Sequence, residues 1–300
     1  AHPVYGYAYK PEKFFGSFTG WMRQRFALEI DRTHVVFSPG IVPAIGIAIQ
    51  ALTAPGDGVV IMPPVYHPFK RLVEDNGRTV LEAPLRDAGG RYELDLQALE
   101  AACSSARMLI FCSPHNPVGR VWTAQELDAV IDIAVRHDVL VFADEIHADL
   151  VFRPYVHLPL HGRSQALQKR LVSSWAPSKT FNIAGLQSSF IVIPDDELRA
   201  RYVRQVSATG QSGPNCMAVE AVIAAYDHGA DWLDELLVYL RGNYEFLVSE
   251  LAVRAPALGV YPCEGTYLAW VDFRGAGLDG AVGPALIDRA GLWLDRKSVG

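Results

Sequence analysis

Residues 108–145 read MLIFCSPHNPVGRVWTAQELDAVIDIAVRHDVLVFADE, and they contain one complete unit of the fold. Met108–Cys112 is an apolar run that predicts a buried strand. Thr123 is a predicted N-cap for a helix over Ala124–His137, and a second apolar run, Val139–Ala143, follows that helix directly. The stretch therefore predicts a strand, a helix and a second strand joined by short connections.

The same alternation runs through the middle of the chain. Strands are expected at His34–Phe37, Gly58–Met62, Thr79–Ala83 and Arg170–Ser174, and helices at Val42–Leu52, Pro68–Asn76 and Asp95–Ser104. Alternating strands and helices with short connections predict an α/β fold, in which a mostly parallel sheet is covered by helices on both faces as a three-layer αβα sandwich. Ligands of such sheets bind at the carboxyl ends of the strands.

Changes of pattern divide the chain into three expected segments. Residues 1–30 are rich in aromatic side chains and form an N-terminal segment, and residues 31–228 form a large domain. Residues 229–300 are expected to form a smaller α+β domain, with helices at Trp232–Leu240, Tyr244–Leu251 and Gly283–Ala290 and a strand pair at Gly259–Tyr261 and Thr266–Val271.

Composition excludes several classes of protein. The net charge of −6 argues against a nucleic acid as partner. No apolar run reaches the ~18 residues of a membrane span, and no signal-peptide pattern is present. The four cysteines lack a Cys-x-x-Cys spacing, which indicates reduced thiols and no structural zinc. These features predict a cytoplasmic protein that binds neither metal, membrane nor nucleic acid.

The most informative residue is Lys179, in the stretch SSWAPSKTFNIAGL (173–186). It follows a predicted buried strand, where a partly desolvated amine is activated for attack on a carbonyl. Taken alone, a Ser-Lys pair favours the ordinary interpretation, in which the Lys179 ammonium reaches solvent. Polar or aromatic residues after the other apolar runs favour a reactive amine.

Three further positions have both an ordinary and a functional interpretation. Asp144 ends a buried strand, so its carboxylate needs a cation, either an arginine or a protonated heterocycle. Asn116 either begins a turn before Pro117 or donates a hydrogen bond to a phenolate oxygen. Tyr66 is either a core residue or a flat surface on which an aromatic ring stacks.

The turn Ser38-Pro39-Gly40 leads into a helix that begins near Ile41 and Val42. It is either an ordinary connection or a phosphate seat made by free backbone N–H groups. Together, these positions describe an aromatic aldehyde with a phosphate, a ring nitrogen and a phenolic oxygen. Pyridoxal 5′-phosphate has this set of groups and acts as an electron sink.

Five stretches carry a resemblance to a known family: PPVYHPF (63–69), SPHNPVGRVW (113–122), DEIHADL (144–150), APSKTFNIAGLQ (176–187) and GTYLAWVD (265–272). The chain resembles fold-type I pyridoxal-phosphate enzymes of the aminotransferase class I/II superfamily. Within it, the chain is similar to the MalY/PatB-type cystathionine β-lyases, and His147 and the Ala-Pro-Ser-Lys run favour this C–S lyase branch.

The resemblance implies a role for each site residue. Lys179 forms a Schiff base with the cofactor and later transfers the proton. Asp144 pairs with the ring nitrogen, Asn116 and His147 lie at the phenolic oxygen, and Tyr66 stacks on the ring. The phosphate is bound by the N–H groups of Ile41 and Val42, by Ser178, and by Tyr7 of a neighbouring subunit, which implies a homodimer with shared sites.

Two departures from the family pattern concern the phosphate and the substrate carboxylate. Gln187 stands where many aminotransferases place a phosphate-binding arginine. The arginine that binds the substrate carboxylate is expected beyond residue 300, and the family's first tens of residues are expected before residue 1.

The resemblance implies β-elimination from cystathionine or a related cysteine S-conjugate, which yields a thiol, pyruvate and ammonia. An aminotransferase of the same fold is the first alternative. A catalytically impaired regulatory protein that keeps the fold is the second.

Overall fold

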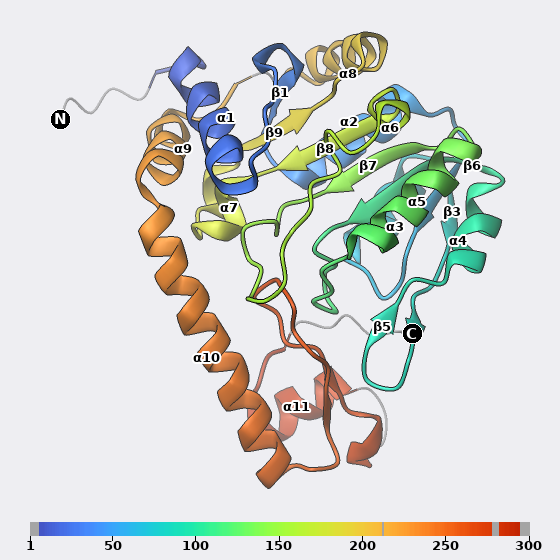
Figure 1. Ribbon diagram of the computed structural model, residues 1–300, viewed down its shortest axis with the longest axis vertical. Helices are drawn as coiled ribbons and strands as arrows, with labels where there is room; N and C mark the ends of the chain where they lie inside the picture. Colours follow the sequence, from blue (N-terminus) through green and yellow to red (C-terminus); the bar gives the residue numbers. More distant parts are fainter. Residues whose placement is uncertain (1–5, 212, 278–281, 295–300) are drawn as a thin grey trace.

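A seven-stranded sheet forms the centre of the computed structural model, which describes residues 6–211, 213–277 and 282–294 (Figure 1). In spatial order its strands are β1 (Val35–Ser38), β9 (Ser189–Val192), β8 (Leu171–Trp175), β7 (Leu140–Asp144), β6 (Ala106–Cys112), β2 (Gly58–Ile61) and β3 (Thr79–Glu82). β9 pairs antiparallel with both of its neighbours, whereas the other neighbouring strands pair in parallel. The predicted mostly parallel sheet is confirmed.

Helices cover both faces of the sheet. The helices are α1 (Glu12–Phe26), α2 (Ile41–Leu52), α3 (Pro68–Asp75), α4 (Leu96–Cys103), α5 (Ala124–Arg136), α6 (Gln165–Gln168), α7 (Pro177–Thr180), α8 (Asp196–Thr209), α9 (Cys216–His228), α10 (Ala230–Arg254) and α11 (Val282–Ala290). Short strands β4 (Arg86–Asp87) and β5 (Tyr92–Glu93) form one hairpin, and β10 (Gly259–Val260) and β11 (Val271–Asp272) form a second antiparallel pair.

The alternation of side chains along the central strands assigns each helix to a face. Ile110 of β6 and Phe142 of β7 belong to the core formed with α2, α3 and α8. Phe111 and Val141, one position along, belong to the core formed with α4 and α5. α1 and α9 cover the β8–β9–β1 end of that second face, where the Phe190 ring is buried among aromatic side chains. β6, β7 and β8 are therefore buried on both sides, and the apolar runs of β6 and β7 reflect this.

The helix after residue 123 begins where the sequence predicts. The Thr123 hydroxyl accepts a hydrogen bond from the Glu126 N–H at 3.2 Å, and the Glu126 carboxylate accepts one from the Thr123 N–H at 2.8 Å. This capping box satisfies two backbone donors that the first turn leaves free. It fixes the point at which the loop after β6 ends.

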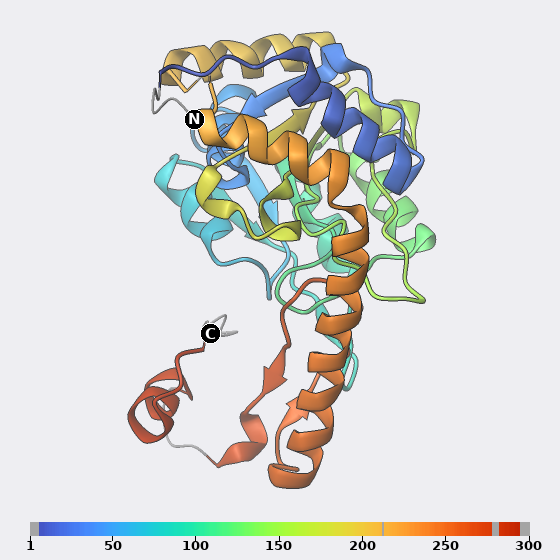
Figure 2. The same ribbon diagram turned by 90° about the vertical axis from the view of Figure 1, so that its left-hand side faces the viewer.

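The C-terminal part differs from the expectation in two places. The two helices predicted at 232–240 and 244–251 are one continuous helix, α10, which extends away from the sheet (Figure 2). Gly242 costs only about 1 kcal/mol inside a helix, and the Arg241–Glu245 ion pair at 2.7 Å spans it. The strand expected at 266–271 is reduced to β11, because Thr266 has a positive φ of 70° that interrupts an extended chain.

The aromatic-rich N-terminal segment also contains an element that its composition did not predict. α1 buries Phe14, Phe18 and Trp21 against α9 and the sheet. In the described ranges, none of these helices has the length and apolar character needed to cross a bilayer.

Candidate active site

The carboxyl ends of three neighbouring strands bring the principal predicted residues together. β6, β7 and β8 lie side by side in the sheet, and Asp144 is in register with Cys112 on one side and Ser174 on the other. Asn116 follows the end of β6 by four residues, and Lys179 follows the end of β8 by four residues. Because the three strands are parallel, these residues gather at one edge of the sheet.

Asp144 is a buried carboxyl, 5% exposed, at the last position of β7. Its Oδ1 accepts a hydrogen bond from the Ile146 N–H at 3.2 Å. Burial, assisted by the charge of Glu145, raises the pKa of Asp144 to about 7, although the Ile146 hydrogen bond and the positive charge of Lys179 oppose that shift. The site thus holds a carboxyl that a nearby cation would stabilise in its charged form.

Lys179 lies on α7, a single helical turn that starts directly after β8. Pro177 occupies the first turn of α7, where its missing N–H costs nothing. The side chain is half-buried and lies close enough to Asp144 for their charges to interact. A lysine held by the end of a buried strand has little freedom of position, which suits an amine that reacts at a fixed point.

Asn116 and His147 are also brought together. The Asn116 Nδ2 lies 3.3 Å from the His147 Nε2, and both side chains are buried. His147 lies in the turn that follows β7, which is closed by a hydrogen bond from the Leu150 N–H to the His147 carbonyl at 2.9 Å. A buried amide and a buried imidazole at a strand edge can present hydrogen-bonding groups to a ligand oxygen.

Tyr267 is a member of this site that sequence reasoning missed. Its ring meets the His147 ring edge to face, with centroids 5.5 Å apart and planes at 66°. It comes from the loop between β10 and β11, far along the chain from the strand ends. Tyr267 lies in the stretch 265–272, which carries part of the resemblance to the family. No local sequence pattern indicates which strand this loop approaches.

Tyr66 and the start of α2 belong to the same core, on the α2 face of the sheet. The Tyr66 ring is half-buried and packs edge to face on Phe69, with centroids 5.6 Å apart. α2 begins at Ile41 without a side-chain cap, and it packs under β7 and β8. The N–H groups of Ile41 and Val42 therefore have no partner within the helix. Neither observation tests the ring stacking predicted for Tyr66 or the phosphate binding predicted for Ile41 and Val42, so both roles stay predictions.

Ser178 and Tyr7 are placed less tightly. Ser178 is half-buried on α7, and its carbonyl accepts a hydrogen bond from the Ile183 N–H at 3.0 Å. Tyr7 is fully exposed on the extended segment before α1. Neither position by itself tests the phosphate contact expected from it.

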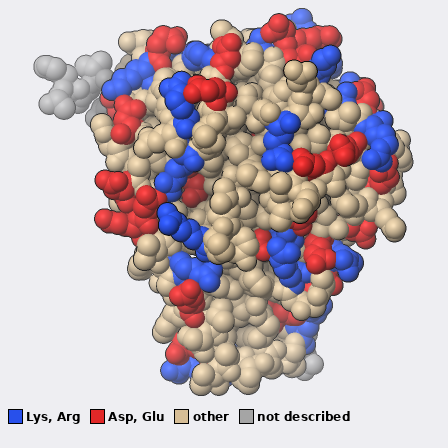
Figure 3. Space-filling view, in the orientation of Figure 1, with Lys and Arg blue, Asp and Glu red and all other residues tan. Residues whose placement is uncertain are grey.

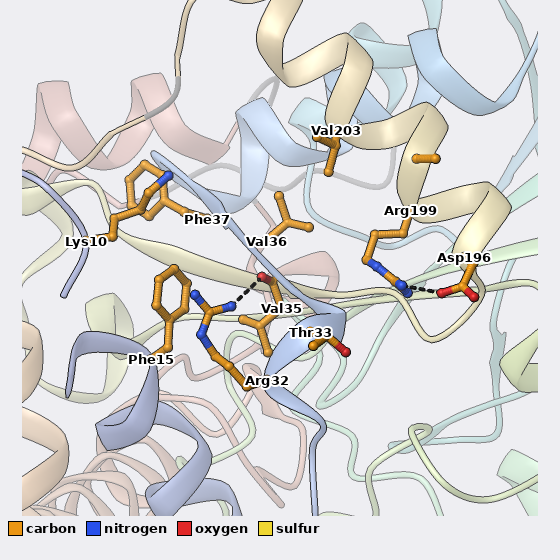
Figure 4. Close-up of a pocket in the computed structure, with 11 residues that line it drawn as sticks. Lys10, Phe15, Arg32, Thr33, Val35, Val36, Phe37, Asp196, Arg199 and Val203 are labelled. Atoms are coloured by element: carbon orange, nitrogen blue, oxygen red, sulfur yellow. Dashed lines mark hydrogen bonds and ion pairs between the residues drawn. The ribbon is translucent and has the colours of Figure 1, made fainter. Parts of the chain in front are cut away.

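A separate hollow of about 490 Å³ lies on the outer side of β1, between α1 and α8 (Figure 4). Its lining includes Arg32, whose guanidinium lies 3.4 Å from the centre of the Phe15 ring, and Arg199, which is paired with Asp196. None of the predicted site residues lines it. The hollow is therefore distinct from the strand-end site.

Charged side chains of both signs are interspersed over the face seen in Figure 3. This face has no broad field of basic residues of the kind that tracks a phosphate backbone. The strand-end site, with its buried polar groups, is suited to a small molecule.

A family model for aminotransferase class I and II matches residues 13–299. The chain belongs to this family. Cystathionine beta-lyase PatB of Bacillus subtilis is 40% identical over 282 residues, covering 93% of this chain and 73% of that protein. Protein MalY of Escherichia coli is 33% identical, covering 96% of this chain and 74% of that protein.

A solved member of the family has the same architecture. The crystal structure of cystalysin from Treponema denticola, which contains a pyridoxal 5′-phosphate cofactor, superposes with a TM-score of 0.94 at 34% identity. The match covers 97% of this chain and 75% of cystalysin. The fold-type I architecture expected from the sequence is confirmed, as is the resemblance to the family.

Proposed function

We propose that this chain is a pyridoxal-phosphate-dependent carbon–sulfur lyase. It would catalyse β-elimination from cystathionine or a related cysteine S-conjugate and release a thiol, pyruvate and ammonia. The observation that carries the proposal is the buried Asp144 carboxyl beside the half-buried Lys179 amine at the ends of β7 and β8. The names of the similar proteins PatB and cystalysin support the same reaction class and cofactor.

The residues at the strand ends fit pyridoxal phosphate group by group. Lys179 would bind its aldehyde covalently, and Asp144 would hold the proton on its ring nitrogen. Asn116 and His147 would lie at the phenolic oxygen, and Tyr66 against the ring face. The phosphate would be bound by the N–H groups of Ile41 and Val42, by Ser178, and by Tyr7 of a second subunit. When bound, the cofactor supplies an electron sink for charge that develops on the substrate.

Asp144 acts through its charge. Alone, this carboxyl has a pKa of about 7, chiefly because burial removes water from it. A positively charged ring nitrogen within hydrogen-bonding distance would lower that pKa and keep the carboxylate ionised at neutral pH. The same pairing keeps the ring nitrogen protonated, which maintains its capacity to accept electrons.

Lys179 would also supply the base, because its amine would take the proton from the substrate α-carbon. Correctly placed general bases contribute ~10²–10⁴-fold to rate. The short α7 turn fixes the Lys179 Cα relative to β8, so that the amine reaches the same point in each turnover.

The Lys179→Ala variant tests this assignment. Purified protein supplied with pyridoxal phosphate should lose the Schiff-base absorbance and pyruvate formation together, because both require the same amine. A variant that retains both would contradict the proposal. In the unsubstituted protein with L-cystathionine, pyridoxamine phosphate formation in place of pyruvate would instead support an aminotransferase.

We also propose the assembly and location that this function implies. The fully exposed Tyr7 is available to a second copy, which supports a homodimer with shared sites. An amino-acid-processing reaction and four free cysteines support a cytoplasmic location. Residues 1–30, 31–228 and 229–300 would be an N-terminal segment, a large cofactor-binding domain and a smaller domain, respectively.

A further inference from the structure

The His147 ring contacts two side chains, Asn116 and Tyr267, that come from distant parts of the chain. Asn116 contacts it from the loop after β6, at 3.3 Å, and Tyr267 contacts it from the loop between β10 and β11, ring edge to ring face. The orientation of the His147 ring therefore depends on how these two loops are held relative to each other.

One buried carboxylate, Glu264, binds both loops. Its side chain is 1% exposed. Oε2 accepts hydrogen bonds from Arg120 Nε at 3.1 Å and from the Val121 N–H at 2.8 Å. Oε1 accepts two from Arg91, at 2.9 and 2.6 Å. Glu264 lies three residues before Tyr267, and Arg120 lies four residues after Asn116.

Backbone hydrogen bonds also join the loop after β6 to the loop between β10 and β11. The Gly119 carbonyl accepts hydrogen bonds from the N–H groups of Glu264 and Gly265, at 2.9 and 3.0 Å. A Cβ placed on Gly265 would lie 3.0 Å from a Val121 side-chain carbon and 2.9 Å from the Leu150 carbonyl oxygen, so the two loops are in close contact here. This close contact leaves no room for a side chain at position 265.

Thr266, the next residue, is held in a strained conformation. Its φ of 70° is unusual for a β-branched residue, and such a strained conformation persists only where the surroundings impose it. Its N–H donates to the Leu150 carbonyl at 2.7 Å, and its hydroxyl accepts from the Leu268 N–H at 3.1 Å. The strained residue directs Tyr267 out of the extended path and towards His147.

The charges around Glu264 balance each other. Arg120 is itself 1% exposed, and its Nη2 donates to both oxygens of Glu126 at 2.8 and 3.0 Å. Two guanidinium groups, from Arg91 and Arg120, thus face two carboxylates, from Glu264 and Glu126. Removing the charge of Glu264 would leave the buried Arg120 undercompensated.

We propose that Glu264 is a positioning residue, which holds the loops that carry Asn116 and Tyr267 against His147 and so sets the orientation of the His147 ring. It acts through these neighbours and does not itself contact the substrate. The functional consequence rests on the proposed role of His147 at the cofactor's phenolic oxygen, whereas the coupling of the two loops does not.

The coupling is tested on cofactor-free protein by hydrogen–deuterium exchange in the Glu264→Gln variant. Glutamine keeps the size of the side chain and one acceptor oxygen but removes the charge. Amides in residues 116–121 and 264–268 should both exchange about 10- to 100-fold faster, because a charge-assisted buried hydrogen-bond network has been weakened. Glu245→Gln, which removes the exposed Arg241 ion pair of α10, is the matched control and should leave both segments unchanged.

The positioning role is tested on protein supplied with pyridoxal phosphate. In Glu264→Gln, the midpoint of the pH titration of the Schiff-base absorbance should shift, and kcat should fall about 10- to 100-fold with a smaller change in KM, as expected for a misplaced group. If Glu264→Gln does not fold, Arg91→Gln, which removes only the Oε1 partner, should produce the same pattern at smaller amplitude.

Two results would overturn the inference. Faster exchange confined to residues 264–268 would show that Glu264 does not hold the loop that carries Asn116. An unchanged absorbance titration together with faster exchange in both segments would show a stabilising role without positioning. Failure of the lyase proposal itself would appear as absent Schiff-base absorbance in the unsubstituted protein, and the exchange experiment would remain interpretable.

Discussion

Replacing Asp144 with asparagine should make the cofactor-free protein more stable at pH 8 and remove part of its pH dependence. Asp144 is 5% exposed, and burial raises its pKa from 3.8 to about 7. Asparagine has nearly the same shape, and its Oδ1 can still accept the Ile146 N–H hydrogen bond seen at 3.2 Å. The substitution therefore removes the charge with little change in packing.

The direction follows from proton binding by the folded and unfolded chains. Between pH 3.8 and about 7, the folded state holds a proton on Asp144 that the unfolded state has lost. The free energy of unfolding therefore falls as the pH rises through this window. A shift of about three pKa units corresponds to about 4 kcal/mol, which is the largest loss that this one carboxyl can cause.

Urea denaturation at pH 5 and pH 8 measures the effect. The free energy of unfolding of wild type should fall more between the two pH values than that of Asp144→Asn, by about 2–4 kcal/mol. Other carboxyls with raised pKa values, such as Asp149, remain in both proteins and largely cancel in the difference. Asp132→Asn, at an exposed position of α5, is the control and should leave the pH dependence unchanged.

Equal pH dependence of wild type and Asp144→Asn would refute the reasoning that burial makes ionisation of Asp144 costly. Pyridoxal phosphate adds a second readout. If its ring nitrogen pairs with Asp144, saturating cofactor should stabilise wild type at pH 8 more than it stabilises the asparagine variant. Equal stabilisation would contradict the proposed pairing but not the cost of burial.

Two further predictions concern the elements that hold the site. Thr123→Ala removes the capping box of α5 and should lower the free energy of unfolding by about 1 kcal/mol, measured by urea denaturation, whereas Thr123→Ser should retain most of it. Phe190→Ala empties a position where the ring stacks on Phe18 at 4.3 Å and should cost about 3–5 kcal/mol. A loss below about 1 kcal/mol for Phe190→Ala would show that the α1 aromatic cluster is not a rigid part of the core.

Much of the fold was predictable because the central strands β6 and β7 are mostly apolar. A strand buried on both faces is a continuous apolar run in the sequence. The run Met108–Cys112 lies within β6, and the run Val139–Ala143 covers all of β7 except its last residue. The capping pair of Thr123 and Glu126 located the start of α5 in the same way, since a cap is a local interaction. The return strand β9 was not predicted, although residues 190–193 form an apolar run as long as that of strands that were.

Some residues of the candidate site could be predicted from local sequence patterns, whereas others depend on contacts between distant segments. Lys179, Asp144 and Asn116 were found from sequence because each lies within a few residues of the end of a predicted strand, and parallel strands align their carboxyl ends. The contact of Tyr267 with His147 and the bonds of Glu264 to Arg91 and Arg120 join segments separated by more than a hundred residues. No periodicity within either segment encodes such a pairing.

By itself, the sequence determined the alternation of strands and helices, the edge of the sheet that carries polar groups, and the family to which the chain is similar. Only the tertiary structure decided the order of strands, the raised pKa of Asp144 and the contacts of His147 with Asn116 and Tyr267. The physical reason is that periodicity and capping act within a few residues. Burial and side-chain pairing depend instead on which distant segments the packed core brings into contact.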